Sequence, residues 1–575
     1  MHDRVEDFTA SSCLTLLCSI HGCSITTSEG IGNSKDGFHP IHERIAGFHA
    51  TQCGFCTPGM CVSLYGTLVN AEKTNRPEPP SGFSKVTAAE AEKAIAGNLC
   101  RCTGYRPIAD ACKSFAADFD IEDLGLNSFW RKGEGKDLKL SRLPQYDKNH
   151  NSIRFPLFLK EIKPIVSLAS EKYCWYSPTS LEELQRILAL NQVNGTRMKL
   201  VVSNTGMGYY KDNEVYDMYV DLRGISELSK IRKDWKGIEI GATVTISKAI
   251  EALKEESKGD FLSDYVMILE KIADHMNKVA SGSIRNTASV GGNLVMAQKH
   301  HFPSDIATIL LAVDSMVHIM TGTQFEWLTL EEFLERPPLS LDSVLLSIKV
   351  PSLELNKRES SEPESRFFFE SYRASPRPLG NALPYLNAAF LAKVSPCKDS
   401  GGTVIDSCRL SFGAYGTKHA IRAKKVEKFL TGNLLSVSIL YDAINLVTDT
   451  IVPDDDTSQT AYRSSLSAGF IFQFFNLLIG SPERITNGYL KGHTNLSSVE
   501  AFELSKNQKQ VHHGKFPALL SSGEQVLEAG TKYEPIGEPV IKSGAALQAS
   551  GLLSSTFWIK ILTVPFLFIS IDISK

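Results

Sequence analysis

Residues 49–65 read HATQCGFCTPGMCVSLY, and residues 94–112 read AIAGNLCRCTGYRPIADAC. Each stretch places a close pair of cysteines just ahead of a proline and a run of apolar residues at helical spacing. Proline is tolerated at the first helical position, so helices are predicted to begin at Thr57 and at Pro107. Both cysteine pairs therefore belong to loops next to helix ends, where the helix dipole favours a thiolate.

A third helix is predicted between these two loops. Thr87 and Glu90 form the capping box of a helix start, and Gly97 can end that helix. Cys61 and Cys112 fall on the apolar faces of their helices, so we expect them to be core residues rather than ligands.

The cysteines are unevenly distributed along the chain. Nine of the twelve precede residue 113, in a chain of 575 residues whose first residues lack the layout of a signal peptide. This clustering indicates a metal site in a reducing compartment rather than disulfides. Two cysteines one residue apart, as at positions 100 and 102, are unusual for zinc but acceptable to a pair of sulfide-bridged irons. An iron–sulfur cluster is favoured, with zinc or unrelated buried thiols as the alternatives.

The overall composition is that of an ordinary globular protein, with 42% hydrophobic and 22% charged residues. A formal net charge of −3 gives no basic field for nucleic acid or an anionic membrane. The length exceeds what one core can organise, so several domains are expected. We also expect a cytoplasmic location.

Residues 52–60, QCGFCTPGM, and residues 97–108, GNLCRCTGYRPI, resemble the helical 2Fe–2S domain of the xanthine dehydrogenase/aldehyde oxidase family. Residues 38–60 are most similar to the plant aldehyde oxidases of that family. The resemblance implies that Gln52 and the last cluster ligand approach molybdopterin in full-length members. It implies four cluster ligands, Cys53, Cys56, Cys100 and Cys102.

The same resemblance implies a multidomain α+β fold and a domain order. The expected order is a partial ferredoxin-like 2Fe–2S domain (1–46), a helical 2Fe–2S-binding domain (47–120), a linker (121–170), an FAD-binding domain of the PCMH type (171–355), a flavoprotein C-terminal domain (362–475), a linker with the start of a molybdenum domain (476–551) and a hydrophobic tail outside the family pattern (552–575).

Two parts of the family pattern are not found in the sequence. The family's first 2Fe–2S domain uses a Cys-x4-Cys-x2-Cys run and a later single cysteine as its ligands. In this sequence the run is absent, and Cys13 stands where the later cysteine would be. We therefore expect one 2Fe–2S cluster rather than two. The family pattern does not continue beyond Gly551, so a molybdenum cofactor is not expected in this chain.

Residues 198–211, MKLVVSNTGMGYYK, read as an apolar strand that enters a glycine-bearing turn. Backbone N–H groups of such a turn can approach a phosphate, although the residues alone favour a plain tight turn. The stretch is not a G-x-G-x-x-G fingerprint, so a Rossmann site is not supported. Residues 283–297, SIRNTASVGGNLVMA, form a second small-residue stretch, and Thr179 with Glu182 predicts a capped helix before the first.

Together these stretches resemble the two FAD-contacting segments of the family's flavin domain. Ser203 departs from the family, which commonly has glycine there, and serine would weaken FAD binding if the position required a positive φ or a close approach of the phosphate. An aspartate and a leucine further along the chain complete the implied FAD contacts, which are Leu200, Val201, Val202, Ser203, Asn204, Thr205, Gly206, Met207, Ser289, Gly292, Asn293, Asp305 and Leu345.

Residues 557–573 contain twelve apolar residues among seventeen, interrupted by Lys560, Pro565 and Asp572. This length is at the short limit for a membrane-spanning helix, and no membrane association is expected. This apolar segment has three interpretations: an end of the chain without a structural role, a segment that packs on the protein or on a partner, and a membrane anchor. The first is favoured, so removal of residues 552–575 is expected to raise the soluble yield by removing an exposed apolar run.

The function implied by the resemblance is electron transfer between one 2Fe–2S cluster and FAD, without aldehyde oxidation by this chain. NADH or oxygen are the expected electron partners, and no nucleic acid is expected to bind. One alternative is a non-catalytic isoform that forms a homodimer, or a heterodimer with full-length aldehyde oxidase. The other is a separate electron-transfer subunit.

Overall fold

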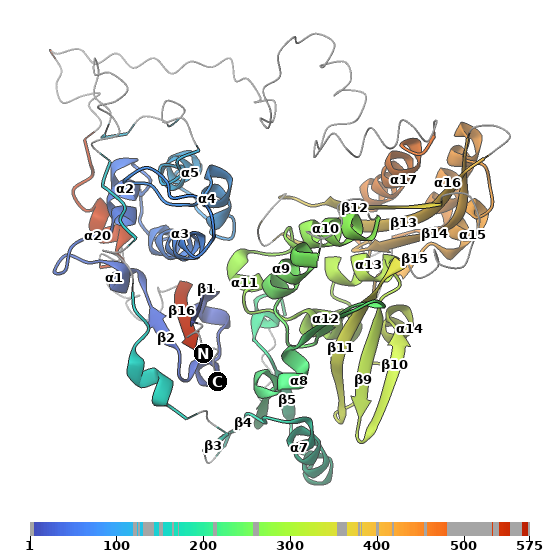
Figure 1. Cartoon of the computed structure of the whole chain (residues 1–575), viewed down its shortest axis with the longest axis horizontal. Helices are drawn as coiled ribbons and strands as arrows, with labels where there is room; N and C mark the ends of the chain where they lie inside the picture. Colours follow the sequence, from blue (N-terminus) through green and yellow to red (C-terminus); the bar gives the residue numbers. More distant parts are fainter. Residues whose placement is uncertain are drawn as a thin grey trace.

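The computed structural model shows a multidomain α+β protein in which three units follow one another across the molecule (Figure 1). Much of the expected linkers (121–170 and 476–551) and of the expected tail lies outside the described residues. The structure describes residues 5–118, 124, 127–129, 143–148, 153–163, 166–170, 172–210, 216–256, 264–353, 365–377, 380, 382–397, 402–416, 419–453, 457–479, 532, 540–552 and 566–572.

The first unit packs a group of helices on a small sheet. Its elements are β1 (Val5–Ser11), η1 (Ser12–Leu14), η2 (Leu17–Ile20), β2 (Ser24–Thr26), α1 (Ser28–Ile31), α2 (Pro40–Gly47), α3 (Thr57–Glu72), α4 (Ala88–Ala94), α5 (Arg106–Lys113), α20 (Ala545–Ala549) and β16 (Phe566–Asp572). The 3-10 turn η4 (Leu157–Glu161) leads to the second unit.

The helix starts of this unit are confirmed. α3 and α5 carry a proline in their first turn, and α4 has the Thr87–Glu90 capping box. The predicted end of α4 at Gly97 is wrong, because the helix stops at Ala94. A Cβ atom on Gly97 would lie 2.2 Å from the Cβ of Ser281, so this glycine serves the close approach of the second unit instead. Cys61 and Cys112 are fully buried, as expected.

Arg44 of α2 holds the first unit together from inside. Its side chain is buried and donates hydrogen bonds of 2.6 to 3.0 Å to the backbone O atoms of Gly82, Ser114 and Pro144. The guanidinium carbon lies 3.9 Å from the centre of the Phe115 ring. A buried cation is tolerated here because its N–H groups are paired with carbonyl dipoles and it stacks on an aromatic face.

The second unit contains a four-stranded sheet of order β3-β4-β6-β5 and a five-stranded antiparallel sheet of order β10-β9-β11-β8-β7. Buried aliphatic residues of the second sheet and of α9 to α13 form the largest core of this unit. The elements are β3 (Ser167–Ala169), β4 (Cys174–Tyr176), α7 (Leu181–Asn194), β5 (Met198–Val201), η5 (Thr205–Gly208), β6 (Met218–Asp221), η6 (Leu222–Gly224), α8 (Ser226–Ser229), β7 (Ile231–Asp234), β8 (Gly237–Gly241), α9 (Ile246–Glu256), α10 (Asp264–Met276), α11 (Gly282–Arg285), α12 (Val290–His300), α13 (Asp305–Ala312), β9 (Met316–Thr321), β10 (Gln324–Thr329), α14 (Leu330–Glu335) and β11 (Ser343–Pro351).

The start of α7 is one residue later than predicted. Ser180 is the N-cap, and its Oγ accepts a hydrogen bond from the Glu183 N–H at 3.2 Å. The Glu183 carboxylate accepts one from the Thr179 N–H at 2.9 Å. Both Thr179 and Ser180 are followed three residues later by glutamate, so the sequence offers two equivalent capping patterns, and the choice of Thr179 with Glu182 is wrong.

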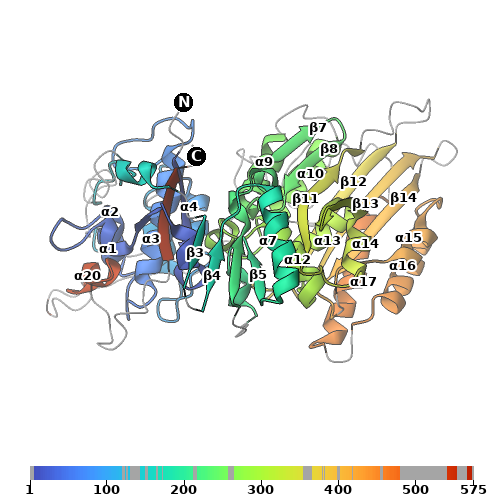
Figure 2. The ribbon, with the colours of Figure 1, turned by 90° about the horizontal axis from the view of Figure 1, so that it is seen from below.

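The third unit is a four-stranded antiparallel sheet covered by helices (Figure 2). Phenylalanines of β13, β14 and α17 meet in its core. Its elements are β12 (Arg366–Ala374), β13 (Leu386–Pro396), β14 (Thr403–Gly413), β15 (Ile421–Arg422), α15 (Lys424–Leu430), α16 (Val437–Thr450) and α17 (Thr460–Asn476).

Part of the expected tail is a strand of the first unit. β16 lies between β1 and β2 and is antiparallel to both. Phe568 and Ile569 are each 2% exposed. The expectation of an exposed apolar run is therefore wrong for residues 566–572, since their pairing partners lie more than five hundred residues away and leave no local signal. Within the described parts of the chain, no helix is long and apolar enough to cross a bilayer.

Candidate iron–sulfur and flavin sites

The four cysteines expected to hold a cluster lie in two loops that face each other. Cys53 and Cys56 precede α3, and Cys100 and Cys102 precede α5. The Sγ atoms of Cys53 and Cys102 are 3.4 Å apart. The thiols of Cys56 and Cys100 are close enough for each to affect the pKa of the other. The structure thus brings all four together as two pairs, each with one member from each loop.

The arrangement of the cysteines as two pairs differs from the arrangement that a single metal ion requires, in which all ligands surround one centre. No group of three or more His, Cys, Asp or Glu side chains lies close enough to hold one ion in the part of the chain that the structure describes. Zinc takes four ligands around one centre, whereas a 2Fe–2S cluster has two irons with two thiolates each. The pairing therefore favours the two-iron cluster.

The surroundings of Cys56 and Cys100 shift the pKa values of these two thiols in opposite directions. The pKa of Cys56 is raised to about 12, mainly by burial and in smaller part by the nearby Cys100 and Cys53. Burial also raises the pKa of Cys100, but hydrogen bonds with Thr103, whose Oγ1 lies 3.1 Å from Cys100 Sγ, more than offset this and the pKa falls below its usual value. Thiolates this close repel one another unless metal ions lie between them.

The shape of the loop before α5 depends on two residues with positive φ. Gly104 has a φ of +68° and Tyr105 a φ of +71°. In this conformation the Cys100 N–H donates to Tyr105 Oη at 3.0 Å, and the Tyr105 N–H donates to Thr103 Oγ1 at 3.1 Å. A positive φ is unfavourable for tyrosine, so these contacts offset the local strain and fix the position of Cys100.

α20 covers the loop before α3 and packs beside α2 (Figure 1). Gln548 donates to the Cys53 backbone O at 3.3 Å and accepts from Thr51 Oγ1 at 3.1 Å. Lys542 Nζ donates to the Gln52 backbone O at 2.5 Å. Sequence reasoning missed these contacts, because nothing local to α20 indicates a partner 490 residues away.

The first predicted FAD segment, residues 200–207, leaves the end of β5 and enters the turn η5. The Met207 N–H donates to the Asn204 backbone O at 3.2 Å. Ser203 does not have a positive φ, and its Oγ lies 3.4 Å from Thr205 Oγ1. The backbone at this position does not require glycine, so the conformational reason to expect weak FAD binding does not apply.

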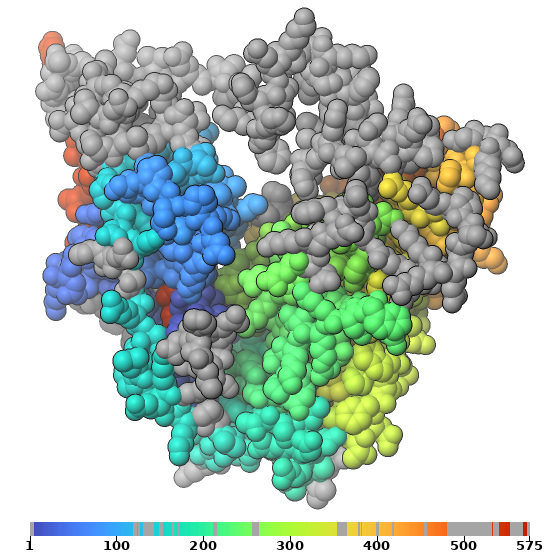
Figure 3. All heavy atoms as spheres, viewed as in Figure 1, coloured from blue at the N-terminus to red at the C-terminus, as the bar shows by residue number. Residues whose placement is uncertain are grey.

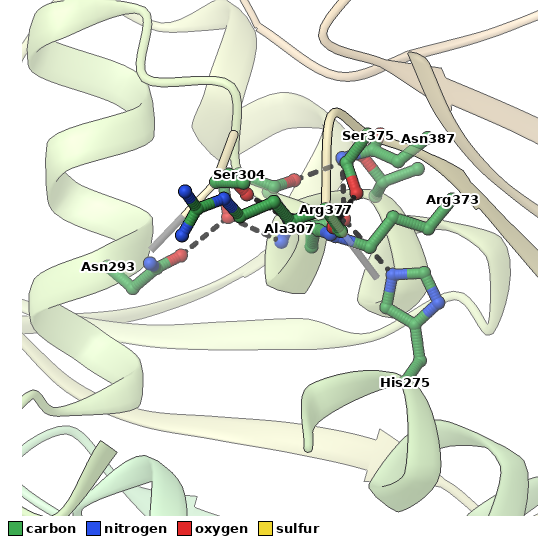
Figure 4. Close-up of polar contacts among 11 residues, drawn as sticks. His275, Asn293, Ser304, Ala307, Arg373, Ser375, Arg377 and Asn387 are labelled. Carbon is green, nitrogen blue, oxygen red and sulfur yellow. Dashed lines mark hydrogen bonds and ion pairs between the residues drawn. The ribbon is translucent and has the colours of Figure 1, made fainter. Parts of the chain in front are cut away.

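The second predicted segment forms the start of α12. Ser289 is the N-cap, and its Oγ accepts a hydrogen bond from the Gly292 N–H at 3.0 Å. Asn293 Oδ1 accepts one from Ser304 Oγ at 2.5 Å, which joins α12 to the N-terminus of α13 (Figure 4). The side chains at both helix starts are thereby fixed.

The two segments meet on α12. A Cβ atom on Gly206 would lie 3.4 Å from Met296 Sδ, so the first segment passes directly over this helix. Leu345, another predicted contact, is 4% exposed in β11, beside an irregularity in the pairing with β9. It belongs to the hydrophobic core that also includes residues of α12 and α13. The predicted FAD contacts therefore share one region of the second unit.

Asp305, the first residue of α13, is buried among polar partners, of which His275, Arg373 and Asn387 are labelled in Figure 4. Its Oδ1 is 3.1 Å from His275 Nε2, 3.2 Å from Arg373 Nε and 3.1 Å from Asn387 Nδ2. Burial raises the pKa of Asp305, but the hydrogen bond with His275 and the charge of Arg373 outweigh burial and the pKa lies below its usual value. Asp305 is therefore ionised and ties α13 to α10 and to the third unit. Sequence reasoning missed its three partners, which come from distant elements.

The first and second units are in direct contact beside these sites. A Cβ atom on Gly208 of η5 would lie 3.2 Å from Leu14 Cδ1 of η1. Arg223 Nη2 donates to the Ser19 backbone O at 2.9 Å. The first unit therefore adjoins the end of the first predicted FAD segment.

A cavity of about 480 Å³ also lies between these units, among α3, α4 and α11. The space-filling view shows the surface hollowed between the blue first unit and the green second unit (Figure 3). The residues that line this cavity include Ser281 and Asn286 but none of the predicted FAD contacts. We assign it to the contact between the units rather than to the flavin site.

Comparison with known proteins assigns all three units. The model described as [2Fe-2S] binding domain matches residues 27–113, and that described as FAD binding domain in molybdopterin dehydrogenase matches residues 170–353. The CO dehydrogenase flavoprotein C-terminal domain matches residues 370–478. Indole-3-acetaldehyde oxidase of Arabidopsis thaliana is 54% identical over 554 residues, which are 96% of this chain and 39% of that protein. The chain is a homologue of the plant aldehyde oxidases.

Other plant aldehyde oxidases show the same relation. Abscisic-aldehyde oxidase of Arabidopsis thaliana is 52% identical, and indole-3-acetaldehyde oxidase of Zea mays is 48% identical, each over 96% of this chain and 39% of that protein. This aldehyde oxidase homologue thus spans about two fifths of the length of these relatives. Its matched domains are those of an iron–sulfur flavoprotein oxidoreductase, with a 2Fe–2S and an FAD domain and the capacity for electron transfer.

Solved structures of related enzymes are more distant. Quinoline 2-oxidoreductase from Pseudomonas putida 86 aligns with 54% of this chain and 98% of that chain, at 19% identity and a TM-score of 0.41. Likeness at this level adds nothing to the assignment, which rests on the plant relatives and the family models.

Proposed function

We propose that the chain carries electrons between one 2Fe–2S cluster and one FAD. The observation that carries this proposal is the arrangement of the cysteines as two contacting pairs at the ends of two loops. The cluster ligands in the proposal are Cys53, Cys56, Cys100 and Cys102. When bound, the cluster supplies a one-electron carrier and FAD a carrier of one or two electrons, so the two can exchange electrons singly.

The protein's own groups would position the cluster. Thr103 Oγ1 lies beside Cys100 Sγ and stabilises its thiolate, while the Tyr105 hydroxyl fixes the Cys100 backbone. Gln548 holds the loop before α3 through its hydrogen bond to the Cys53 backbone O, while the side chains of Cys53 and Cys102 are exposed. Hydrogen bonds to ligand sulfur and exclusion of water are the means by which a protein tunes the potential of such a cluster.

The flavin would be held by the two segments that meet on α12. Backbone N–H groups of residues 204–206 are suited to the FAD diphosphate, because a tight turn presents donors to an anion. The first N–H groups of α12 donate to Ala242, Val244 and Ser289, so this helix start shapes the site without supplying those donors. In the proposal Asp305 acts as a positioning residue, since its Oδ1 already accepts hydrogen bonds from three protein groups.

The proposal extends to electron partners, location and assembly. NADH or oxygen would exchange electrons with the flavin, and the chain would act in the cytoplasm without binding a membrane. Aldehyde oxidation by this chain is not proposed, since the matched domains are the iron–sulfur and flavin domains alone. Pairing of the chain with itself or with a full-length aldehyde oxidase is compatible with the same proposal.

Cofactor analysis of the purified chain tests the proposal. We expect two irons and one FAD per chain, with a single paramagnetic signal after reduction. Cys100→Ser removes one ligand and should abolish the iron signal while FAD is retained, because the flavin segments are on a separate unit. Cys18→Ser, a change to a half-buried cysteine outside the two pairs, is the control and should retain both cofactors.

Two results would contradict the proposal. Stoichiometric zinc in place of iron would establish the mononuclear alternative. Four irons and two paramagnetic signals would show a second cluster that the predicted ligand set does not provide.

A further inference from the structure

The sheet of the first unit is built around a strand from the far end of the sequence. β1 and β2 do not pair with each other, and each pairs with β16, so that the order is β1-β16-β2 (Figure 1). Seven residue pairs join β16 to β1, and three join it to β2. Without β16 the facing edges of β1 and β2 would have no strand partner among the described residues, and two such short strands are not stable separately in water.

The apolar side chains of β16 complete the packing under α3. Phe568 is 2% exposed, and its ring centre lies 5.0 Å from that of Tyr65 in an edge-on arrangement. A Cβ atom on Gly66 would lie 3.5 Å from Phe568 and 2.5 Å from Thr9, so α3 approaches both strands closely at its glycine. α3 is the helix whose N-terminus follows the loop of Cys53 and Cys56, so β16 supports the helix next to the candidate cluster site.

β1 in turn connects the first and second units. The Asn286 side chain, just after α11, donates to the Thr9 backbone O at 3.1 Å. Glu6 forms an ion pair of 2.8 Å with Lys248 of α9. On the other side, Asp7 forms an ion pair with Lys73 at the end of α3. β1 therefore lies between the iron–sulfur unit and the flavin unit, and β16 is the strand that pairs with it.

We propose that β1 and β2 form a strand-binding slot, that residues 566–572 of the same chain occupy it, and that this strand fixes β1 between the two units. The mode is β-strand addition, in which main-chain hydrogen bonds provide affinity and alternate side chains provide selectivity. Phe568 is the selective side chain on the α3 face, and Ile569 is the buried side chain on the opposite face.

Two lysine substitutions in β16 of the full chain test whether the buried position of Phe568, rather than the apolar character of the strand as a whole, holds β16 in the slot. Phe568→Lys places a charge in the buried contact with Tyr65, and β16 should leave the slot. Ile571→Lys is the matched control, because Ile571 is only half-buried and lies opposite Glu6, where a lysine is favourable. Hydrogen exchange followed by mass spectrometry reports on the amides of β1 and β2 in both variants.

The expected result is exchange in residues 5–11 and 24–26 that is at least about tenfold faster in Phe568→Lys and unchanged in Ile571→Lys. In the unmodified chain, residues 566–572 should exchange as slowly as residues 5–11. Fast exchange of residues 566–572 in the unmodified chain would overturn the proposal, even if Phe568→Lys fails to fold. Unchanged exchange of β1 in Phe568→Lys would also overturn it.

The same experiment decides whether the strand acts within one chain. Protection of residues 5–11 that is independent of protein concentration over about a hundredfold range supports occupancy by the same chain, because association would depend on concentration. Protection that rises with concentration, together with a dimer in sedimentation, would overturn that assignment in favour of a second copy. Iron and FAD contents, measured in parallel, keep this test separate from that of the proposed function.

Discussion

Asp305 shows how one buried charge can hold three elements in place. Removing its charge by Asp305→Asn leaves the Arg373 guanidinium buried, 3.2 Å from a neutral group, with its charge uncompensated. Loss of one partner of a buried pair costs about 3 kcal/mol, so we expect a lower melting temperature of the flavin unit and weaker FAD retention. Because the pKa of Asp305 is lowered, its contribution is present above about pH 4 and is lost only as the pH falls further.

The control for this prediction is Asp217→Asn. Asp217 forms an ion pair of 3.1 Å with Arg197 at the surface, where solvent screening makes such pairs weak. Calorimetric unfolding of both variants should show a clear shift for Asp305→Asn and none for Asp217→Asn. Equal shifts would mean that the buried cluster has no special role.

His39 and His42 predict an acid sensitivity of the first unit. The pKa of His39 is lowered to about 3, mainly by burial and in smaller part by His42 and Arg44, and burial lowers that of His42 to about 4. The unfolded chain binds protons at both histidines below about pH 6.5, so the free energy of unfolding falls as the pH drops from there towards 4. Each histidine contributes a loss on the order of 2 kcal/mol at pH 5.

Replacement of His39 tests this sensitivity. The His39 Nδ1 caps α2 by accepting the Ile41 N–H at 3.1 Å, and His39→Asn keeps a capping side chain without a titrating group. We expect this variant to lose less stability than the unmodified chain between pH 7.5 and pH 5, measured by denaturant unfolding. His301→Asn, at an exposed position, is the control and should behave like the unmodified chain. An undiminished acid loss in His39→Asn would contradict the assignment.

At the scale of elements, α20 and β16 are the two segments from the end of the sequence that complete the first unit. Gln548 of α20 pairs with the Thr51 hydroxyl and the Cys53 backbone O, and Gln548→Leu would leave both without that partner. We expect the 51–56 loop to open more often, which should speed iron release to a chelator by about tenfold at unchanged FAD content. Leu547→Ala, one residue earlier and half-buried, should release iron at the original rate. Equal release rates in Gln548→Leu and the unmodified chain would show that α20 does not protect the loop.

Sequence reasoning succeeded where the signal is local. The starts of α3 and α5 follow from a proline in the first turn, and the start of α4 from a capping box, because these interactions span three or four residues. It failed at Gly97, whose small size serves a contact with Ser281 of another unit, and for residues 566–572, whose partners are at the other end of the sequence. An apolar run has the same composition whether it is exposed or paired, so only the fold reveals the difference.

At the candidate sites, too, sequence reasoning succeeded where the signal is local and failed where the partners are distant in the sequence. The four cysteines could be grouped from their spacing and from the family resemblance, and the structure shows how they pair. The partners of Asp305 come from α10, β12 and β13, and no pattern within residues 305–312 indicates them. The concern about Ser203 came from a family comparison, and the observed backbone removes its conformational basis.

At the scale of the whole molecule, the first and second units share an interface made by η1, η5, β1 and the residues next to α11. An arrangement of this kind keeps two cofactor sites of one chain at a fixed separation. The central claim is that a cluster and a flavin bound to the same chain exchange electrons.

The most direct measurement is light-induced reduction of the flavin in the fully loaded chain, followed by absorbance and electron paramagnetic resonance. The account predicts that the reduced flavin is reoxidised as the signal of the reduced 2Fe–2S cluster appears, at a rate independent of protein concentration and absent in Cys100→Ser. A reduced flavin that persists beside an oxidised cluster, or a rate proportional to protein concentration, would contradict it.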